Sequence, residues 1–419
     1  MSFVDRRRFL QSSLGGISAV ALGGGLQADD SASPEGGAPI APHDSLFLTW
    51  RQDPTTTMVI QWIGKSDDAT QIAYAPLKDG MWRTAPVIAK PFPDTDRYVL
   101  RCELVGLTPG SEYKFLVGDA KQRYRFRTMP AKATKEFCFV SGGDAGTGRH
   151  AVNSNRVAAN QDPYFVLIGG DLAYDNGASP KTFLKFLQNY SSTMVDSAGR
   201  LIPMVSCIGN HEVQGHFGAR RDQAGSYLSV FDAFYQDVTY GTLDFGDYLS
   251  LVMLDTGHIA DIQGEQTDWL EKTLTARAEI PHLFGVNHVP CYPSYRNPEG
   301  KDEKLGIGEE QRKLWCPLFE KHKVDVVLEH HDHTFKRTHP LTDGRIDANG
   351  VHYLGDGSWG QLRAPKRPEE RPYLAKVSQA YHVTVHRLEG DRRFHVAMED
   401  TGKIADVVTT VSKRASKRG

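Results

Sequence analysis

The stretch YFVLIGGDLAY, residues 164–174, joins a run of apolar residues to a turn that carries Asp171 and Tyr174. A short apolar run without alternation is typical of a strand that is buried on both faces of a sheet. The paired glycines that follow let the backbone turn sharply and approach a ligand closely. The stretch therefore predicts a strand of an α/β sheet that ends in side chains able to do chemistry.

Four further apolar runs end in the same way, in a polar cluster that holds Asp, Asn or His. The clusters are Gly143-Asp144-Ala145-Gly146, Gly209-Asn210-His211-Glu212, Gly285-Val286-Asn287-His288 and His330-His331-Asp332-His333. Taken alone, each has an ordinary explanation as a turn, a helix cap or a core histidine. Functional residues gather outside the carboxyl ends of strands in α/β sheets, so the five loops are expected to meet in one crevice. Together they predict a site for two metal ions.

The composition limits what this site can be. The 419 residues include 16 His but only five Cys, so nitrogen and oxygen ligands are expected and thiolate-rich zinc or iron–sulfur sites are excluded. The formal net charge of −2 provides no global field that would hold nucleic acid or an anionic membrane. An anionic ligand must therefore be held by a local site.

The order GDxG, GDxxY, GNHE, xxxH and xHxH within residues 137–340 resembles the calcineurin-like metallophosphoesterases, and the Tyr of the second motif resembles their purple acid phosphatase branch. The resemblance implies an α/β four-layer (αββα) catalytic domain after an N-terminal all-β fibronectin-III-like sandwich. It also implies an acid phosphatase-like enzyme that hydrolyses small phosphate monoesters with a metal-bound hydroxide.

The resemblance further implies a ligand set for two ions. A ferric ion would be held by Asp144, Asp171, Tyr174 and His333. A divalent ion, Zn²⁺, Mn²⁺ or Fe²⁺, would be held by Asp171, Asn210, His288 and His331. His211 would lie beside the substrate and either contact the phosphate or pass a proton to the leaving group.

The chemistry of these side chains agrees with that division. Carboxylate and phenolate are hard anionic donors suited to Fe³⁺, whereas His, Asn and a shared carboxylate suit the divalent ions. A bridging carboxylate also screens the repulsion between two cations ~3.5–4 Å apart. Such a pair can clamp a phosphate and lower the pKa of a bound water.

Three positions depart from the family pattern. Gly285 stands where the fourth motif has Val, at a position that packs and does not ligate. His330 replaces the Gly of GHxH, and alternation along an extended chain does not choose between the pair 330 and 332 and the pair 331 and 333, whereas the resemblance chooses 331 and 333. Asn297-Pro298 stands where plant members carry a His pair, so no leaving-group acid is expected there. Arg296 is either a phosphate contact or a solvated surface arginine.

Residues 45–128 follow a different pattern, in which apolar and polar residues alternate, as in 58–62 and 98–104. Period-two runs separated by turns predict an antiparallel sandwich. The segment 107–113 resembles a tyrosine corner, in which the Tyr113 hydroxyl hydrogen-bonds to the chain upstream. Since the segment holds no cluster of His, Asp or Glu, it is read as a packing and positioning domain, with a separate binding module as the alternative.

The amino terminus resembles a twin-arginine export signal. Arg6-Arg7-Arg8 precedes a weakly apolar, glycine-rich stretch that is too short to span ~30 Å of hydrocarbon. This predicts a periplasmic or extracellular protein with no membrane span in its mature form. The predicted organisation is a signal at 1–28, a linker at 29–44, the sandwich at 45–130, the catalytic domain at 135–400 and a basic tail at 401–419.

Two other functions fit parts of the sequence. A phosphodiesterase would use the same ligand set, and a non-catalytic phosphate-binding or surface-binding protein would rely on the sandwich. The complete set of ligand residues argues against the second. In each enzymatic case the implied partner is a small phosphate ester. No nucleic acid scaffold is implied, and the sequence does not define the oligomeric state.

Overall fold

The computed structural model describes residues 43–78, 80–134, 137–301 and 304–414. These residues belong to one unit that begins at His43. The predicted signal at 1–28 and all but the last two residues of the predicted linker lie outside the described residues. No helix among the described residues is long and apolar enough to cross a membrane.

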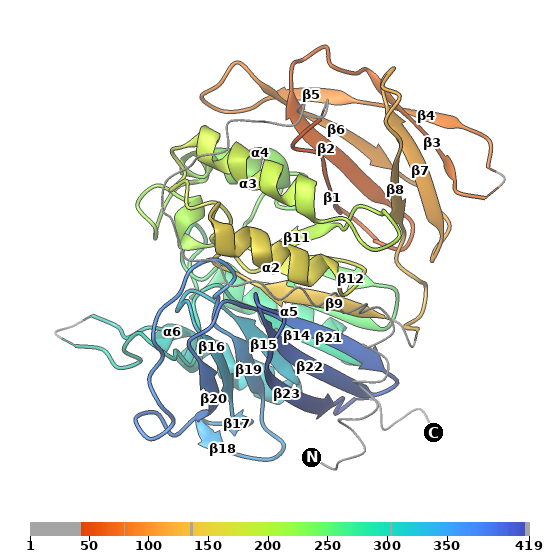
Figure 1. Cartoon of the computed structure of the whole chain (residues 1–419). Coiled ribbons are helices and arrows are strands. Elements are labelled where there is room, and N and C mark those ends of the chain that lie inside the picture. The colour runs from red at the N-terminus through yellow and green to blue at the C-terminus, as the bar shows by residue number, and fades with distance from the viewer. Residues whose placement is uncertain (1–42, 79, 135–136, 302–303, 415–419) are drawn as a thin grey trace, which may run out of the picture. The chain divides into compact units, whose positions relative to one another are not determined.

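The alternating segment forms two four-stranded antiparallel sheets (Figure 1). The first consists of β1 (Phe47–Thr49), β2 (Met58–Gly64), β6 (Tyr98–Leu104) and β5 (Ile88–Pro91). The second consists of β4 (Arg83–Pro86), β3 (Gln71–Pro76), β7 (Glu112–Val117) and β8 (Tyr124–Arg127). The predicted tyrosine corner is confirmed, because the backbone N–H of Thr108 donates to the Tyr113 hydroxyl over 2.8 Å.

The remainder of the chain forms two larger mixed sheets. The six-stranded sheet consists of β11 (Met204–Ser206), β10 (Val166–Ile168), β9 (Cys138–Gly142), β21 (His382–Glu389), β22 (Arg392–Glu399) and β23 (Ile404–Val411). The seven-stranded sheet consists of β12 (Gly241–Phe245), β13 (Leu249–Met253), β14 (His282–Val286), β15 (Val326–Glu329), β19 (His352–Gly355), β16 (Phe335–Thr338) and β20 (Leu374–Ser378). Each apolar run that the sequence singled out is a strand. A two-residue hairpin, β17 (Leu341–Thr342) and β18 (Arg345–Ile346), lies apart from both sheets.

The two large sheets pack face to face, with helices on their outer sides. Leu251 of β13 points into the core between the sheets, whereas its neighbour Val252 points into the core under the helices. Phe139 of β9 meets Phe284 of β14 across the inner core, with ring centroids 5.5 Å apart. This confirms the predicted four-layer αββα arrangement.

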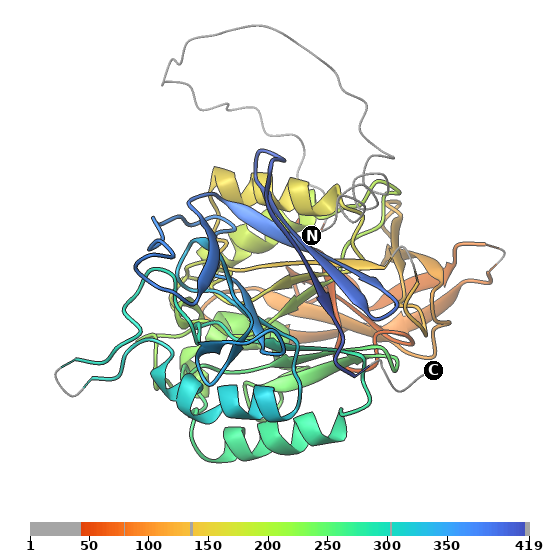
Figure 2. The same ribbon diagram turned by 90° about the horizontal axis from the view of Figure 1, so that it is seen from below.

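The helices divide between the two outer faces. On one side lie α2 (Arg149–Ala159) and α3 (Pro180–Thr193); on the other lie α5 (Glu265–Ala276), α6 (Glu309–Leu314) and α7 (Cys316–Lys321) (Figure 2). The short α4 (Gly225–Phe231) precedes the seven-stranded sheet. The sequence pattern predicts helices over residues 180–192 and 263–277, which correspond to α3 and α5, but it does not predict the other helices.

The end of the chain differs from the expected basic tail. Within the described residues, Ile404–Val411 forms β23 and pairs antiparallel with β22 along its length. Its Val-rich and Thr-rich composition suits an edge strand that is half buried. Residues 404–411 therefore continue the catalytic sheet.

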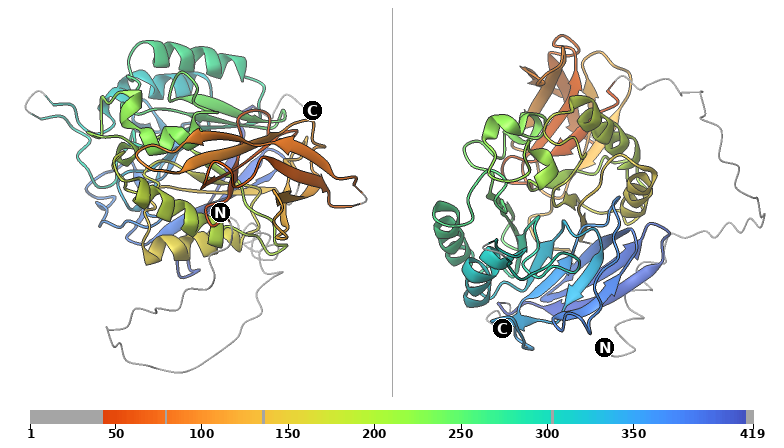
Figure 3. Two further views of the ribbon diagram at one scale, coloured as in Figure 1. Left: turned by 90° about the horizontal axis from the view of Figure 1, so that it is seen from above. Right: turned by 90° about the vertical axis from the view of Figure 1, so that its left-hand side faces the viewer.

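The sandwich shares its core with the catalytic sheets. Trp50 packs edge-on against Phe165, which precedes β10, and Phe245 of β12, with ring centroids 6.1 and 5.9 Å apart. The Arg101 guanidinium donates to Asp232 after α4 over 2.7 Å. The sandwich strands, coloured red to orange, lie next to the yellow-green helices of the catalytic domain (Figure 3). These contacts support the interpretation of the sandwich as a packing and positioning domain.

Candidate metal centre

All five predicted loops meet at one edge of the two sheets. Each follows the carboxyl end of its strand: β9, β10 and β11 in one sheet, and β14 and β15 in the other. Two groups of buried ligand atoms result, each within 4.8 Å: Asp144, Asp171 and His333, and Asp171, His288 and His331. Asp171 belongs to both groups.

The first group gains the phenol of Tyr174. Its hydroxyl lies 3.2 Å from Asp144 Oδ1 and 3.0 Å from His333 Nε2. His333 Nε2 is in turn 3.0 Å from Asp144 Oδ1. These three atoms form a nearly equilateral triangle.

The second group gains the side-chain amide of Asn210. His288 Nε2 lies 3.1 Å from Asn210 Oδ1, 3.2 Å from His331 Nδ1 and 3.3 Å from Asp171 Oδ1. Ligand atoms bound to one ion at right angles are ~3 Å apart, given metal–ligand distances of ~2.1 Å. Both groups therefore have the spacing of ligands around an ion.

One carboxylate oxygen at the centre accepts no hydrogen bond from the described residues. Asp171 is fully buried, and its Oδ2 makes no hydrogen bond within the described residues. A buried carboxylate oxygen without a donor is costly unless a cation satisfies it. The donor set, four residues with oxygen ligands and three with imidazole nitrogens, therefore fits a pair of metal ions.

The backbone at the site is strained to aim these side chains. Five of the seven candidate ligands have left-handed φ angles: Asp144 (58°), Asp171 (54°), Tyr174 (60°), His331 (76°) and His333 (61°). Residues other than glycine adopt such angles rarely, at a cost of ~1–3 kcal/mol each, and they cluster at functional sites. The concentration of this strain at one place marks the site independently of any motif.

Hydrogen bonds behind the ligands hold their orientation. His288 Nδ1 donates to the backbone oxygen of Gly169 over 2.8 Å, which leaves Nε2 to face the centre. Glu212 accepts the backbone N–H groups of Gly209, Asp171 and Leu172 at 2.7–2.8 Å. The Glu of the GNHE cluster thus ties two of the ligand loops together.

The charges at the centre favour a cation. Despite its burial, the pKa of the Asp171 carboxyl is held below its usual range by His288 and His211. Burial alone would lower the pKa of His288, but the charge and hydrogen bond of Asp171 outweigh burial and raise that pKa to about 9. Burial and the carboxylates of Asp144 and Asp171 hold the pKa of the Tyr174 phenol well above its usual value. Since ligands bind metals in their deprotonated forms, metal binding here releases protons.

His211 lies on the open side of the centre. Its Nδ1 donates to Asn176 Oδ1, and its Nε2 is 3.9 Å from Asp171 Oδ2. A quarter of its side chain remains exposed. Asn176, which sequence reasoning missed, thus orients the imidazole that faces incoming solutes.

His330 points away from the centre. Its Nδ1 donates to the backbone oxygen of Asn287 over 2.8 Å, and burial lowers its pKa to about 4. The ring fills the space above Gly143 and Gly169, where an added Cβ would approach it to 2.7 and 1.9 Å. Of the two alternatives left by the sequence, the pair 331 and 333 is the one that the structure brings to the ligand groups.

Arg296 matches neither of its predicted environments fully. It is partly buried and donates to Asp332 Oδ1 over 2.8 Å and to the backbone oxygen of His331. Asp332 also accepts the backbone N–H of Tyr295 over 2.6 Å. The arginine therefore braces the loop that carries His331 and His333.

Sequence reasoning missed the segment Gly355–Gly360, which begins at the last residue of β19 and runs along the first ligand group. The N–H of Gly360 donates to the backbone oxygen of Asp144 over 3.0 Å. At Gly357, with φ of 71°, an added Cβ would lie 1.7 Å from Asp144 Oδ2. The signal for it was the Gly-Asp pair Gly355-Asp356 after an apolar strand, which resembles the pairs at 143–144 and 170–171.

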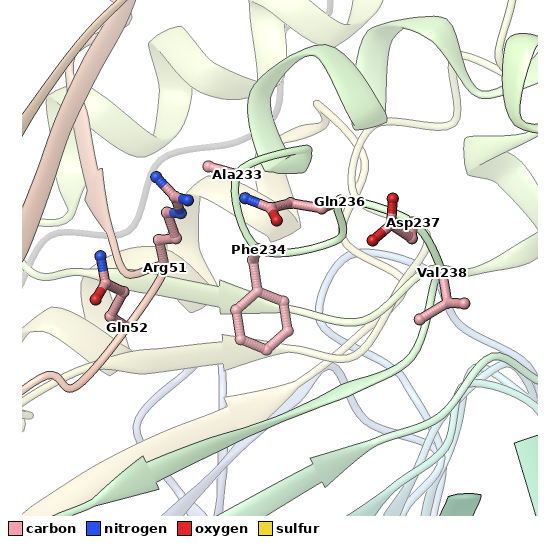
Figure 4. Close-up of a pocket in the computed structure, with 7 residues that line it drawn as sticks. All are labelled: Arg51, Gln52, Ala233, Phe234, Gln236, Asp237 and Val238. Atoms are coloured by element: carbon pink, nitrogen blue, oxygen red, sulfur yellow. The ribbon is translucent and has the colours of Figure 1, made fainter.

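A surface hollow of about 410 Å³ lies away from these residues (Figure 4). Arg51 and Gln52 of the sandwich line one side, and residues 233, 234 and 236–238 line the other. None of the candidate ligands contributes to it. It is therefore not part of the metal centre.

Two family models match this chain. Residues 43–128 match the family model described as the purple acid phosphatase N-terminal domain, and residues 145–335 match that of the calcineurin-like phosphoesterases. Purple acid phosphatase 21 of Arabidopsis thaliana is 24% identical over 74% of this chain and 71% of its own. Human acid phosphatase type 7 is 24% identical over 91% of this chain and 94% of its own.

The fold also has a solved counterpart. The structure of the purple acid phosphatase PPD1 from yellow lupin seeds superimposes with a TM-score of 0.72 over 90% of this chain and 75% of that one, at 17% identity. The chain therefore belongs to the calcineurin-like metallophosphoesterases as a purple acid phosphatase-like member, in a family of metal-dependent phosphoester hydrolases that use a dinuclear metal centre.

Proposed function

We propose that this chain is an exported phosphomonoesterase of the acid phosphatase type. The observation that carries the proposal is the pair of buried ligand groups that share Asp171. A carboxylate common to two groups of this spacing suits two ions ~3.5–4 Å apart, the arrangement that clamps a phosphate in two-metal hydrolases.

In this proposal Asp144, Asp171, Tyr174 and His333 hold Fe³⁺, and Asp171, Asn210, His288 and His331 hold Zn²⁺, Mn²⁺ or Fe²⁺. The phenol and the carboxylate of the first group support a hard trivalent ion. The two imidazoles and the amide of the second group support a divalent ion.

The ions, when bound, would supply positive charge to the phosphate and acidify a water. Because Asp171 belongs to both ligand groups, it fixes the distance between them. His211, oriented by Asn176, presents Nε2 at the open side, where it either holds a phosphate oxygen or supplies a proton to the leaving group.

A comparison of two substrates tests this function. The purified, metal-loaded protein is expected to hydrolyse p-nitrophenyl phosphate at least about tenfold more efficiently than bis-p-nitrophenyl phosphate, measured as kcat/KM. The reverse order would assign the site to phosphodiesters instead. Activity on neither ester, with both ions bound, would reject the proposal.

Tyr174→Phe tests the ferric assignment. The variant is expected to lose the visible absorption that a tyrosinate–iron pair gives, while its fold is kept because the ring remains. The loss of one anionic ligand should also lower iron content relative to the wild type. A wild-type protein that is colourless, and a variant of equal activity and iron content, would contradict the assignment.

Export is supported by the Arg6-Arg7-Arg8 segment and the glycine-rich apolar stretch after it. We place the signal at 1–28, the linker at 29–44, the sandwich at 45–130 and the catalytic domain from 135 onward. Replacing Arg6 and Arg7 together by Lys should leave the full-length protein in the cytoplasm. Unchanged export of that variant would contradict a twin-arginine signal.

A further inference from the structure

Phe217 is an exposed aromatic residue beside the metal centre. Its side chain is 48% exposed, and its ring centroid lies 6.4 Å from that of His331. Single exposed apolar side chains are common on protein surfaces and need no explanation by themselves. Phe217 differs because its neighbour, His331, is a candidate metal ligand.

The loop that carries Phe217 is built to hold it there. Gly215, His216 and Gly218 all have left-handed φ angles, of 86°, 71° and 62°. The N–H groups of Gly218 and Ala219 donate to the backbone oxygens of residues 257 and 258 over 2.9 and 2.8 Å. The loop is therefore tied to a second segment at the base of the ring, and its one strained non-glycine residue adjoins Phe217.

The ring rests on His258, which is fully buried. The two ring centroids are 4.9 Å apart at 35°. His258 Nδ1 donates to the backbone oxygen of His216, and Nε2 lies 2.9 Å from Thr256 Oγ1, so both of its nitrogens have partners. His258 thus has no lone pair left for a metal and instead supports the exposed ring from below.

Planar side chains continue around the opening. The ring of His216 is 5.0 Å from that of His211, which is 4.3 Å from that of Tyr174. His216 itself is held by a 3.1 Å hydrogen bond between its Nδ1 and the backbone oxygen of Asn210. The side of the centre that faces solvent is therefore bordered by aromatic and imidazole faces.

We propose that Phe217 is a specificity-determining residue that contacts the organic group of the phosphate ester and favours planar, aromatic esters over small polar ones. The inference rests on the proposed phosphomonoesterase function and adds a substrate class to it. Aromatic rings gain from offset or edge-on contact with another ring, beyond the area that they bury. A polyol group gains nothing comparable.

The test compares naphthyl phosphate with glycerol phosphate as substrates of the metal-loaded protein. In Phe217→Ala the KM for naphthyl phosphate should rise about threefold to tenfold while kcat stays close to the wild-type value, because the ring binds ground and transition states alike. Both constants for glycerol phosphate should stay unchanged. Phe217→Trp should restore the low KM for naphthyl phosphate.

Trp82→Ala provides the matched control, since Trp82 is 42% exposed and lies in the sandwich. It should change neither substrate's constants. Metal content must be equal in all variants, which separates loss of the ring from damage to His331. A wild type that hydrolyses neither ester rejects the proposed function; a wild type that hydrolyses both, with Phe217→Ala unchanged or equally impaired on the two, rejects this inference alone.

Discussion

Asp171→Asn is expected to lower phosphate-ester hydrolysis by more than about 100-fold, because changes that only support metal ligands already cost ~10- to 100-fold and Asp171 is shared by both ligand groups. Asn is nearly isosteric and tolerates the left-handed φ of 54° at this position. It cannot, however, offer two anionic oxygens to two ions. Steady-state rates on p-nitrophenyl phosphate measure the effect.

Asp175→Asn is the matched control for this substitution. Asp175 lies in the same loop and is also buried, but it belongs to neither ligand group. Burial raises the pKa of its carboxyl to about 7, so the neutral amide should replace it at small cost. Equal loss of activity in the two variants would show that the loop, and not the bridging carboxylate, matters.

Gly357→Ala is expected to weaken metal binding at the first ligand group by about tenfold to 100-fold. The new Cβ would lie 1.7 Å from Asp144 Oδ2 and 2.9 Å from the backbone nitrogen of His331. Because one of these atoms is backbone, the clash can be relieved only by displacing Asp144 or the loop of His331. Titration of the metal-free protein with iron, followed by its visible spectrum, measures the loss.

Gly402→Ala separates this clash from backbone strain. Gly402 has a φ of 83°, yet an added Cβ there meets nothing within 4 Å. Its replacement should cost ~1 kcal/mol of stability through the left-handed backbone alone and leave metal binding intact. If Gly357→Ala bound iron as tightly as Gly402→Ala does, the close packing of residues 355–360 on Asp144 would not contribute to metal binding.

The strands and the ligand loops were predictable because their signals are local. A run such as residues 164–168 followed by Gly-Gly-Asp encodes both a buried strand and the turn at its end. The shared edge of parallel strands then brings Asp144 and Asp171 together without any knowledge of tertiary contacts. The tyrosine corner at Tyr113 is local in the same sense.

The supporting parts of the site were not predictable, because they depend on contacts between distant segments. Nothing in the sequence near Gly357 indicates that Asp144 will lie against it. The ring of Phe217 acquires its setting only when the segment at 257 and 258 pairs with its loop. The strand Ile404–Val411 likewise has no local signal that distinguishes it from a tail, because only its pairing with β22 makes it an edge strand.

The most direct test of a shared two-ion centre is the number of metal ions per chain, determined by elemental analysis of the wild type and of Asp171→Asn side by side. We expect about two ions per chain in the wild type. We expect Asp171→Asn, folded to the same degree by circular dichroism, to retain one ion or none. A wild type that binds a single ion, or a variant that keeps both, would contradict the assignment of Asp171 as the carboxylate that joins the two ligand groups.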